Sequence, residues 1–164
     1  MKKQLFSLFA VLTALFTGCS LNDVAVSLAQ ERIRKSHASC ILLKDGHIIT
    51  QESGKGLAPL FTVLDKYSKE MNGGVIVDKV IGKAAASLVI CGKASAVYTE
   101  LISEPALELL KKHGVKVQYG KCVPQILNRN KSGLCPMEER VAKIDDPQKA
   151  VEVLRTACAA LNKK

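Results

Sequence analysis

Hydrophobic and polar residues follow one another along the chain in blocks that predict strands and helices in turn. Two short apolar runs, CILLK and HIIT, flank Asp45-Gly46. This dipeptide accepts the positive backbone angles of a tight turn, so the pattern predicts a β-hairpin. Apolar residues at helical spacing follow in GLAPLFTVLDKYSKEM, which runs into Asn72-Gly73-Gly74. The spacing predicts a helix after the hairpin, ended by the glycines.

Strand-like and helix-like blocks then alternate. GVIVDKV, SAVYTELI and VKVQYGKCV read as strands, and GKAAASLVICG and SEPALELLKKHG as the helices between them. Such an order implies crossover connections and a largely parallel inner sheet with helices on its faces. The predicted class is α/β, with a mixed sheet that starts with a hairpin and has helices on both faces. Ligands are favoured at the carboxyl ends of such strands, where helices begin.

The first residues have the three parts of an export signal. Lys2 and Lys3 are the basic start, Leu5 to Phe16 the apolar stretch, and Thr17-Gly18-Cys19 the small-residue cleavage site. The apolar stretch is shorter than the roughly 20 residues of a membrane-spanning helix. A cysteine after Thr-Gly also resembles the bacterial lipobox, although phenylalanine replaces the usual leucine. We therefore expect lipidation of Cys19 and a membrane-anchored lipoprotein of the bacterial cell envelope; simple secretion is the alternative.

The remaining chain is long enough for one domain with a real core. We predict a signal peptide at 1–18, a tether or leading helix at 19–38, the main domain at 39–144 and a C-terminal packing helix at 145–164. An Asp cap and Pro147 in the first turn mark the start of the last helix.

The chain is basic, with a formal charge of +9 at pH 7. Such an excess suits an anionic ligand or a phospholipid surface. Aromatic residues make up only 4% of the chain and no arginine-rich stripe occurs, so nucleic acid is not an expected partner. Cys40 and Cys91 lie in apolar runs and read as buried hydrophobic residues. Cys122 and Cys135 flank a loop, so they could form a disulfide or a redox pair.

Charged and polar residues gather where predicted strands end and helices begin. Asp78 and Lys79 fall at the carboxyl end of one apolar strand, and Lys83 opens the next helix. Ser103 and Glu104 occupy the next such junction. Adjacent strand ends lie about 5 Å apart, so both junctions would share one pocket wall. The structural alternative is that Ser103 caps its helix, Glu104 faces the helix dipole and the lysines are solvated.

The segment NRNKSGLCPMEE offers a second group of candidates. Asn128 and Arg129 could hold an anion or tie the loop down. Cys135 precedes a proline at a predicted helix start, where the helix dipole lowers a thiol pKa; its alternatives are a structural role or a disulfide. Glu138 is placed to act as a cap. These residues would complete the pocket from the C-terminal side.

Several of these stretches together resemble a known prokaryotic family, domain of unknown function 1893. They are CILLKDGHIITQESGKGLAPL, VDKVIGKAAA, ISEPALELLKKHGVKVQYGK, ILNR and GLCPMEE, which extend from Cys40 to Val141. The resemblance implies a cytidine-deaminase-like fold. This agrees with the order of strands and helices predicted above.

The fold suggests zinc-dependent deamination, but the required ligands are missing. Zinc deaminases use His-x-Glu at one helix start and Pro-Cys-x-x-Cys at the next. Here the two helix starts read Gly82-Lys83-Ala84 and Ser103-Glu104-Pro105-Ala106. A protonated lysine, a serine and an alanine do not coordinate zinc. The sequence therefore predicts neither a metal nor another cofactor.

The expected function is binding of a small anionic, nucleotide-like ligand. Lysine ammonium groups, hydroxyls and helix N–H groups would hold its charge. The enzyme alternative is a metal-independent hydrolase or transferase with Cys135 or Lys83 as nucleophile and Glu104 as a further catalytic candidate. A thiol redox protein that uses Cys122 and Cys135 is the third possibility.

Overall fold

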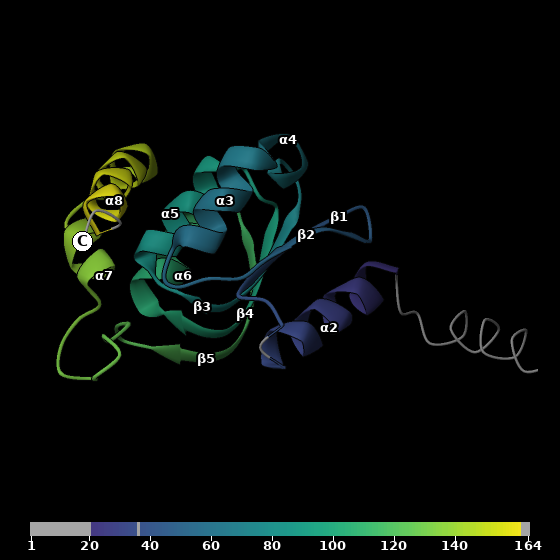
Figure 1. Ribbon diagram of the computed structural model, residues 1–164, viewed down its shortest axis with the longest axis horizontal. Coiled ribbons are helices and arrows are strands. Elements are labelled where there is room, and N and C mark those ends of the chain that lie inside the picture. Colours follow the sequence, from purple (N-terminus) through teal and green to yellow (C-terminus); the bar gives the residue numbers. More distant parts are fainter. Residues whose placement is uncertain (1–20, 36, 162–164) are drawn as a thin grey trace, which may run out of the picture.

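The computed structural model describes residues 21–35 and 37–161 (Figure 1). The sequence expectations for the leader and for Cys19 lie outside these residues. Along the described chain the elements are α2 (Leu21–Arg34), β1 (Cys40–Lys44), β2 (His47–Glu52), α3 (Ala58–Lys66), α4 (Ser68–Met71), β3 (Val75–Ile81), α5 (Lys83–Cys91), β4 (Ala96–Ser103), α6 (Glu104–Lys112), β5 (Lys116–Val123), α7 (Pro136–Val141) and α8 (Pro147–Leu161).

The strands form a five-stranded mixed sheet in the order β2-β1-β3-β4-β5. β1 pairs antiparallel with β2 and with β3, whereas β3, β4 and β5 are parallel to one another. The predicted hairpin turns at Asp45 and Gly46, whose φ angles are 50° and 78°. The predicted α/β class, with a hairpin first and crossover helices after it, is confirmed.

Helices cover both faces of the sheet (Figure 1). On one face α3, α5 and α6 enclose the larger core, which includes Leu60, Ile76, Leu88 and Leu110. α8 packs against α5 from outside, so this side of the molecule has a further layer. The other face is covered by α2 over β1 and β3.

α2 is an integral part of the domain. Its residues Ala29 and Ile33 are buried against Ile41, Leu43 and Val77 of the sheet. From Leu21 to Arg34 the region forms a helix that packs on the sheet, as the leading-helix alternative expects. A truncation before β1 would expose this apolar surface to water.

Two element boundaries differ from those predicted. The single helix expected after the hairpin is broken at Tyr67, whose φ of −125° and ψ of 32° are not helical, giving α3 and the short α4. β3 continues to Ile81, one residue beyond the predicted strand, so Asp78 and Lys79 lie within the strand and three and two residues before its end. β4 pairs with β3 through Ile81, and this pairing keeps the last residues extended.

The last helix begins as predicted. The Asp146 carboxylate accepts the backbone N–H of Gln148 at 2.9 Å, and Pro147 occupies the first turn. Ala150 and Leu154 are fully buried against the core. Val151 is also buried, whereas Val153 is 36% exposed.

Candidate functional site

Asp78 lies where β1 stops covering β3. The register between these strands ends at the pair Cys40 and Asp78, so beyond this point β3 has a strand neighbour only in β4. One Asp78 carboxylate oxygen accepts the N–H of Val80 at 3.2 Å, and the buried Cys40 thiol donates to the same carboxylate. Burial raises the pKa of Asp78 to about 7, against the opposing effect of these donors.

Glu138 of α7 caps the start of α5 across the fold. Its two carboxylate oxygens accept the backbone N–H groups of Lys83 at 2.7 Å and Ala84 at 2.9 Å. Gly82 is required here, because a Cβ at this position would collide with the Glu138 carboxylate. Burial raises the pKa of Glu138, although the two N–H donors act in the opposite direction. The free N–H groups that we expected to meet an anionic ligand are thus already bound to a carboxylate of the chain itself.

The Lys83 side chain is directed at the junction of α7 and α8. Its ammonium donates to the Ala142 carbonyl at 2.9 Å and to the Asp145 carboxylate at 3.0 Å. Lys83 is 7% exposed. The chain itself therefore binds the Lys83 ammonium. This arrangement differs from the ligand-binding role expected from the sequence and from the alternative role as a nucleophile.

A pocket of about 380 Å³, here called the central pocket, lies beside Asp78 and the start of α5. Its charged residues are Asp78, Lys79 and Glu138. The rest of the lining is small or apolar and comes from the end of α2, the segment after β2, α5 and the loop before α7: Ile33, Ala38, Ser39, Gly54, Gly56, Leu57, Val80, Gly82, Ala84, Ala85, Ile126, Cys135 and Met137.

A neighbouring pocket of about 560 Å³, the basic pocket, contains cations and no carboxylate. Lys55, Arg129 and Arg140 supply the charge, and an apolar floor comes from Leu57, Ala58, Leu127, Pro136, Met137 and Cys158. Among the residues that the structure describes, no carboxylate lies within ion-pair distance of these three cations. Lys55 and Arg140 were not predicted from the sequence, because nothing in their spacing brings the segment after the hairpin next to α7.

The two pockets share Gly56, Leu57, Cys135 and Met137 in their walls. We call the combined feature the groove. Cys135 thus lies at the junction between the carboxyl-lined end and the cation-lined end. One end of the groove can accept hydrogen-bond donors, and the other can hold an anion.

The second predicted junction lies apart from the groove. Ser103 and Lys83 do come together, with Glu138, in a separate cavity of about 180 Å³. The Ser103 hydroxyl caps α6 by accepting the Ala106 N–H at 3.4 Å, as in the structural alternative. Glu104 is exposed and lines neither this cavity nor the groove. The shared pocket wall expected for Lys83 and Glu104 is therefore not formed.

The loop before α7 is organised by Asn128. Its side-chain oxygen accepts the Ser132 N–H at 3.0 Å, so of its two predicted roles the structure shows the loop-tying one. Cys122 and Cys135 are both free thiols. Within residues 21–35 and 37–161, no group of three or more His, Cys, Asp or Glu residues is arranged to hold a metal ion. In the same part of the chain, no helix is both long and apolar enough to span a bilayer.

The sequence matches a family model described as Domain of unknown function (DUF1893) over residues 28–157. The chain belongs to this family. The match extends beyond the stretch from Cys40 to Val141 on which the resemblance was based, and it takes in half of α2 and most of α8. Both helices pack on the domain, in agreement with this longer match.

Among solved structures, a DUF1893 family protein from Thermotoga maritima is 26% identical, with a TM-score of 0.74 over 80% of this chain and 88% of that chain. Two forms of Acinetobacter baumannii RibD are 14% identical, with TM-scores of 0.45 and 0.43 over 61% of this chain. This chain covers only 35% of RibD, and the likeness is too weak to carry a conclusion. A search of the curated proteins gives no match.

Proposed function

We propose that this DUF1893 family member binds a small anionic, nucleotide-like ligand along the groove. The observation that carries the proposal is the division of charge between the two ends. Lys55, Arg129 and Arg140 line one end without an ion-pair partner in the described chain. Asp78 and Glu138 line the other end. A ligand with an anionic group and a ring that carries N–H donors matches both ends.

The basic pocket supports an anion site that differs from the one expected at the helix starts. A guanidinium group presents N–H donors in a fixed fork that suits phosphate or carboxylate. Arg129 and Arg140 line the same pocket as several apolar residues, so the two guanidinium groups can hold an anionic group while the apolar residues contact the ligand body. The volumes of the two pockets, about 380 and 560 Å³, are within the range of small-molecule sites.

The central pocket supports a polar, ring-like portion of the ligand. Asp78 has a pKa of about 7, so near neutral pH it can accept or donate a hydrogen bond. Lys79 is exposed at the same mouth and can neutralise a second ligand charge. Small residues such as Gly82, Ala84 and Ala85 form one wall, which a flat group can approach closely.

The enzyme alternative has one supporting observation. Cys135 lies at the junction of the two pockets, within reach of a bound ligand. None of the histidines of the described chain lines either pocket, so a cysteine hydrolase would lack the usual base. The groove therefore supports a binding function better than a reaction at this thiol.

Calorimetric titration of the full chain tests the proposal, with a nucleoside monophosphate, the corresponding nucleoside and inorganic phosphate as probes. We expect the monophosphate to bind at least about tenfold more tightly than the nucleoside, and its affinity to fall as salt rises. The double variant Arg129→Gln, Arg140→Gln should lose about tenfold or more in affinity for the monophosphate. Lys66→Gln, which removes an exposed cation of α3 outside the groove, is the matched control and should bind as the unmodified chain does.

Two results would contradict the proposal. One is equal affinity for the nucleoside and its monophosphate. The other is unchanged affinity in the double arginine variant. Cys135→Ser separates the enzyme alternative, because it should retain ligand binding and would abolish any turnover that depends on the thiol.

A further inference from the structure

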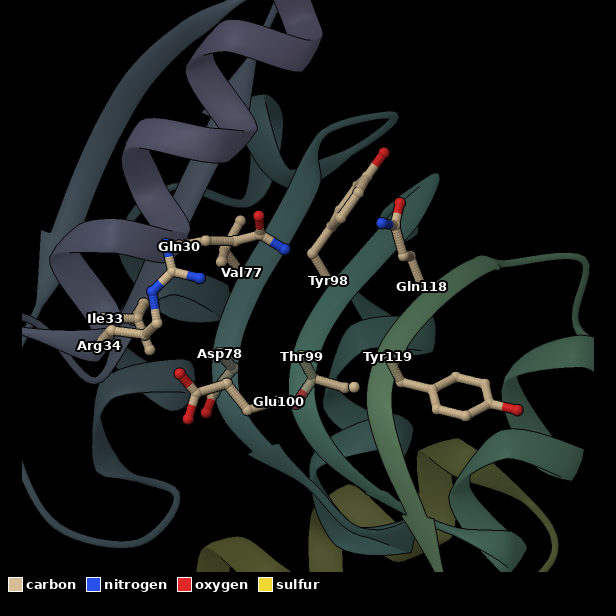
Figure 2. Close-up of a pocket in the computed structure, with 11 residues that line it drawn as sticks. Gln30, Ile33, Arg34, Val77, Asp78, Tyr98, Thr99, Glu100, Gln118 and Tyr119 are labelled. Carbon is tan, nitrogen blue, oxygen red and sulfur yellow. The ribbon is translucent and has the colours of Figure 1, made fainter.

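A trough of about 340 Å³ lies on the sheet face that α2 covers (Figure 2). Its floor comes from β3, β4 and β5, and α2 bounds it on one side. Val77 and Tyr98 of this floor pack with α2, so the trough is on the face opposite α5. It shares Ile33 and Asp78 with the central pocket, and its other residues belong to neither end of the groove.

The trough lies where the pairing of the parallel strands is interrupted. Asp78, Thr99 and Tyr119 are in register across β3, β4 and β5, and pairing resumes two residues further along each strand. Glu100 and Gly120 occupy the skipped position of β4 and β5. Gly120 adds no side chain to the floor, and a Cβ there would lie 2.9 Å from the Glu100 carbonyl oxygen. The margin of the trough at β5 therefore stays open.

Two opposite charges line the trough without pairing with each other. Arg34 of α2 and Glu100 of β4 are both exposed, and among the described residues neither has a partner at ion-pair distance. Glu31 of α2 is bound by Lys35 at 2.7 Å. The Asp78 carboxylate already accepts a backbone N–H of its own strand. A ligand that carries both charges can therefore bind Arg34 and Glu100 together.

The other end of the trough offers uncharged polar groups. Figure 2 shows Arg34 at the same end as the carboxyl groups, whereas Tyr98 and Gln118 project together at the far end. Tyr98 and Gln118 are neighbours across β4 and β5, and Gln30 of α2 lines the same trough. In the part of the chain that the structure describes, these three side chains make no hydrogen bond. A carboxamide both donates and accepts, so this end suits a polar group without charge.

We propose that the trough binds a free amino acid with an uncharged polar side chain. The ligand carboxylate binds the Arg34 guanidinium, whose fixed fork of N–H donors matches it, and the ligand ammonium binds Glu100. The ligand side chain extends toward Tyr98 and the two glutamines. A volume of about 340 Å³ is at the lower end of the range for small-molecule sites, as such a ligand requires.

Thermal unfolding of the full chain with glutamine, asparagine or serine tests the proposal first. We expect at least one of the three to raise the unfolding midpoint, because a ligand of the folded state stabilises it. Calorimetry then compares the tightest binder with its carboxamide, which lacks the carboxylate, and with its N-acetyl derivative, which lacks the ammonium. Each derivative should bind at least about tenfold more weakly than the amino acid.

Single variants assign the two charges. Arg34→Gln should lose about tenfold or more in affinity and no longer distinguish the amino acid from its carboxamide. Glu100→Gln should lose a similar factor and no longer distinguish the amino acid from its N-acetyl derivative. Lys111→Gln and Glu108→Gln, which change exposed residues of α6 outside the trough, are the matched controls and should bind as the unmodified chain does. The double arginine variant of the basic pocket should also retain amino-acid binding, which separates this site from the proposed nucleotide site.

Several results would overturn the proposal. They are an unchanged unfolding midpoint with all three amino acids, equal affinity for the amino acid and its two derivatives, and unchanged affinity in either Arg34→Gln or Glu100→Gln. Tighter binding of an amino acid blocked at both ends would also overturn it, because the trough would then recognise a peptide. Both altered side chains are exposed, so circular dichroism should show that each variant is folded.

Discussion

Replacing Asp78 by asparagine should remove a pH dependence of stability that originates at one carboxyl group. Asp78 is flanked by the buried Cys40 thiol and faces the central pocket, and burial raises its pKa to about 7 from 3.8. In the unfolded chain the group ionises near its ordinary pKa. Between these two pKa values, folding must therefore either keep the Asp78 carboxyl protonated or bury its charge, and both reduce stability.

The sign of the pH dependence follows from the linkage between protonation and folding. Because the folded pKa is the higher one, the unfolded state loses its proton first as pH rises. The contribution of Asp78 to stability is complete below about pH 4 and is lost by about pH 7. The difference between a pKa of 3.8 and one of about 7 corresponds to about 4 kcal/mol of stability at most. Asp78 is half-buried and borders two pockets, so water screens part of this, and we expect about 2 kcal/mol.

Urea unfolding followed by circular dichroism, at several pH values from 4 to 8, measures this effect. Relative to the unmodified chain, Asp78→Asn should gain about 2 kcal/mol of stability between the two ends of the range. Asp65→Asn is the control, because Arg155 lowers the pKa of Asp65 and its titration therefore lies below this pH range. The difference in stability between that variant and the unmodified chain should stay nearly constant from pH 4 to pH 8.

The result that would refute this reasoning is a difference between Asp78→Asn and the unmodified chain that stays constant from pH 4 to pH 8. In that case Asp78 would not titrate over the proposed interval. A difference that fell as pH rose would contradict the raised pKa of Asp78.

Three further changes should have separable effects. Glu138→Ala should destabilise the fold by about 2–4 kcal/mol in urea unfolding, because it leaves two buried N–H groups at the start of α5 without an acceptor; an unchanged midpoint would contradict the cap. Lys83→Met should cost about 1 kcal/mol and leave monophosphate binding in calorimetry unchanged, because the ammonium contacts Asp145 and Ala142 and not the groove. In the producing bacterium, Cys19→Ala should abolish labelling of the chain by radioactive palmitate, and persistent labelling would refute lipidation at this position.

The sequence predicted those parts of the fold that depend on local patterns. Asp45-Gly46 determines the hairpin turn through backbone angles that few residue pairs accept, and Asp146 with Pro147 determines the start of α8. The alternation of strands and helices then leaves few possible topologies for the inner sheet. β3 ends at Ile81, one residue beyond the predicted strand GVIVDKV, because β4 pairs with it to that point. Asp78 and Lys79 stay extended because β4 continues beside them.

The candidate site was predicted less well, for a similar reason. Sequence position placed Lys83, Ser103 and Glu104 at two neighbouring helix starts, and the structure does bring Lys83 and Ser103 together. The position of Lys83 in the sequence does not predict where its long side chain points. In the folded chain its ammonium contacts Asp145, which lies in a distant segment. The cations of the basic pocket come from segments that meet only in the folded chain.

Glu138 explains why charge at a helix start was a misleading guide to the ligand. The start of a helix such as α5 carries a partial positive charge and N–H groups without a partner inside the helix, which together can bind an anion. In this protein α7 supplies that anion, and the Glu138 carboxylate occupies both donors. A ligand anion would have to displace a buried carboxylate, whereas the basic pocket offers cations with no partner to displace in the described chain. The proposed anion site therefore lies at Arg129 and Arg140, and in this proposal the carboxyl groups of Glu138 and Asp78 would face the uncharged end of the ligand.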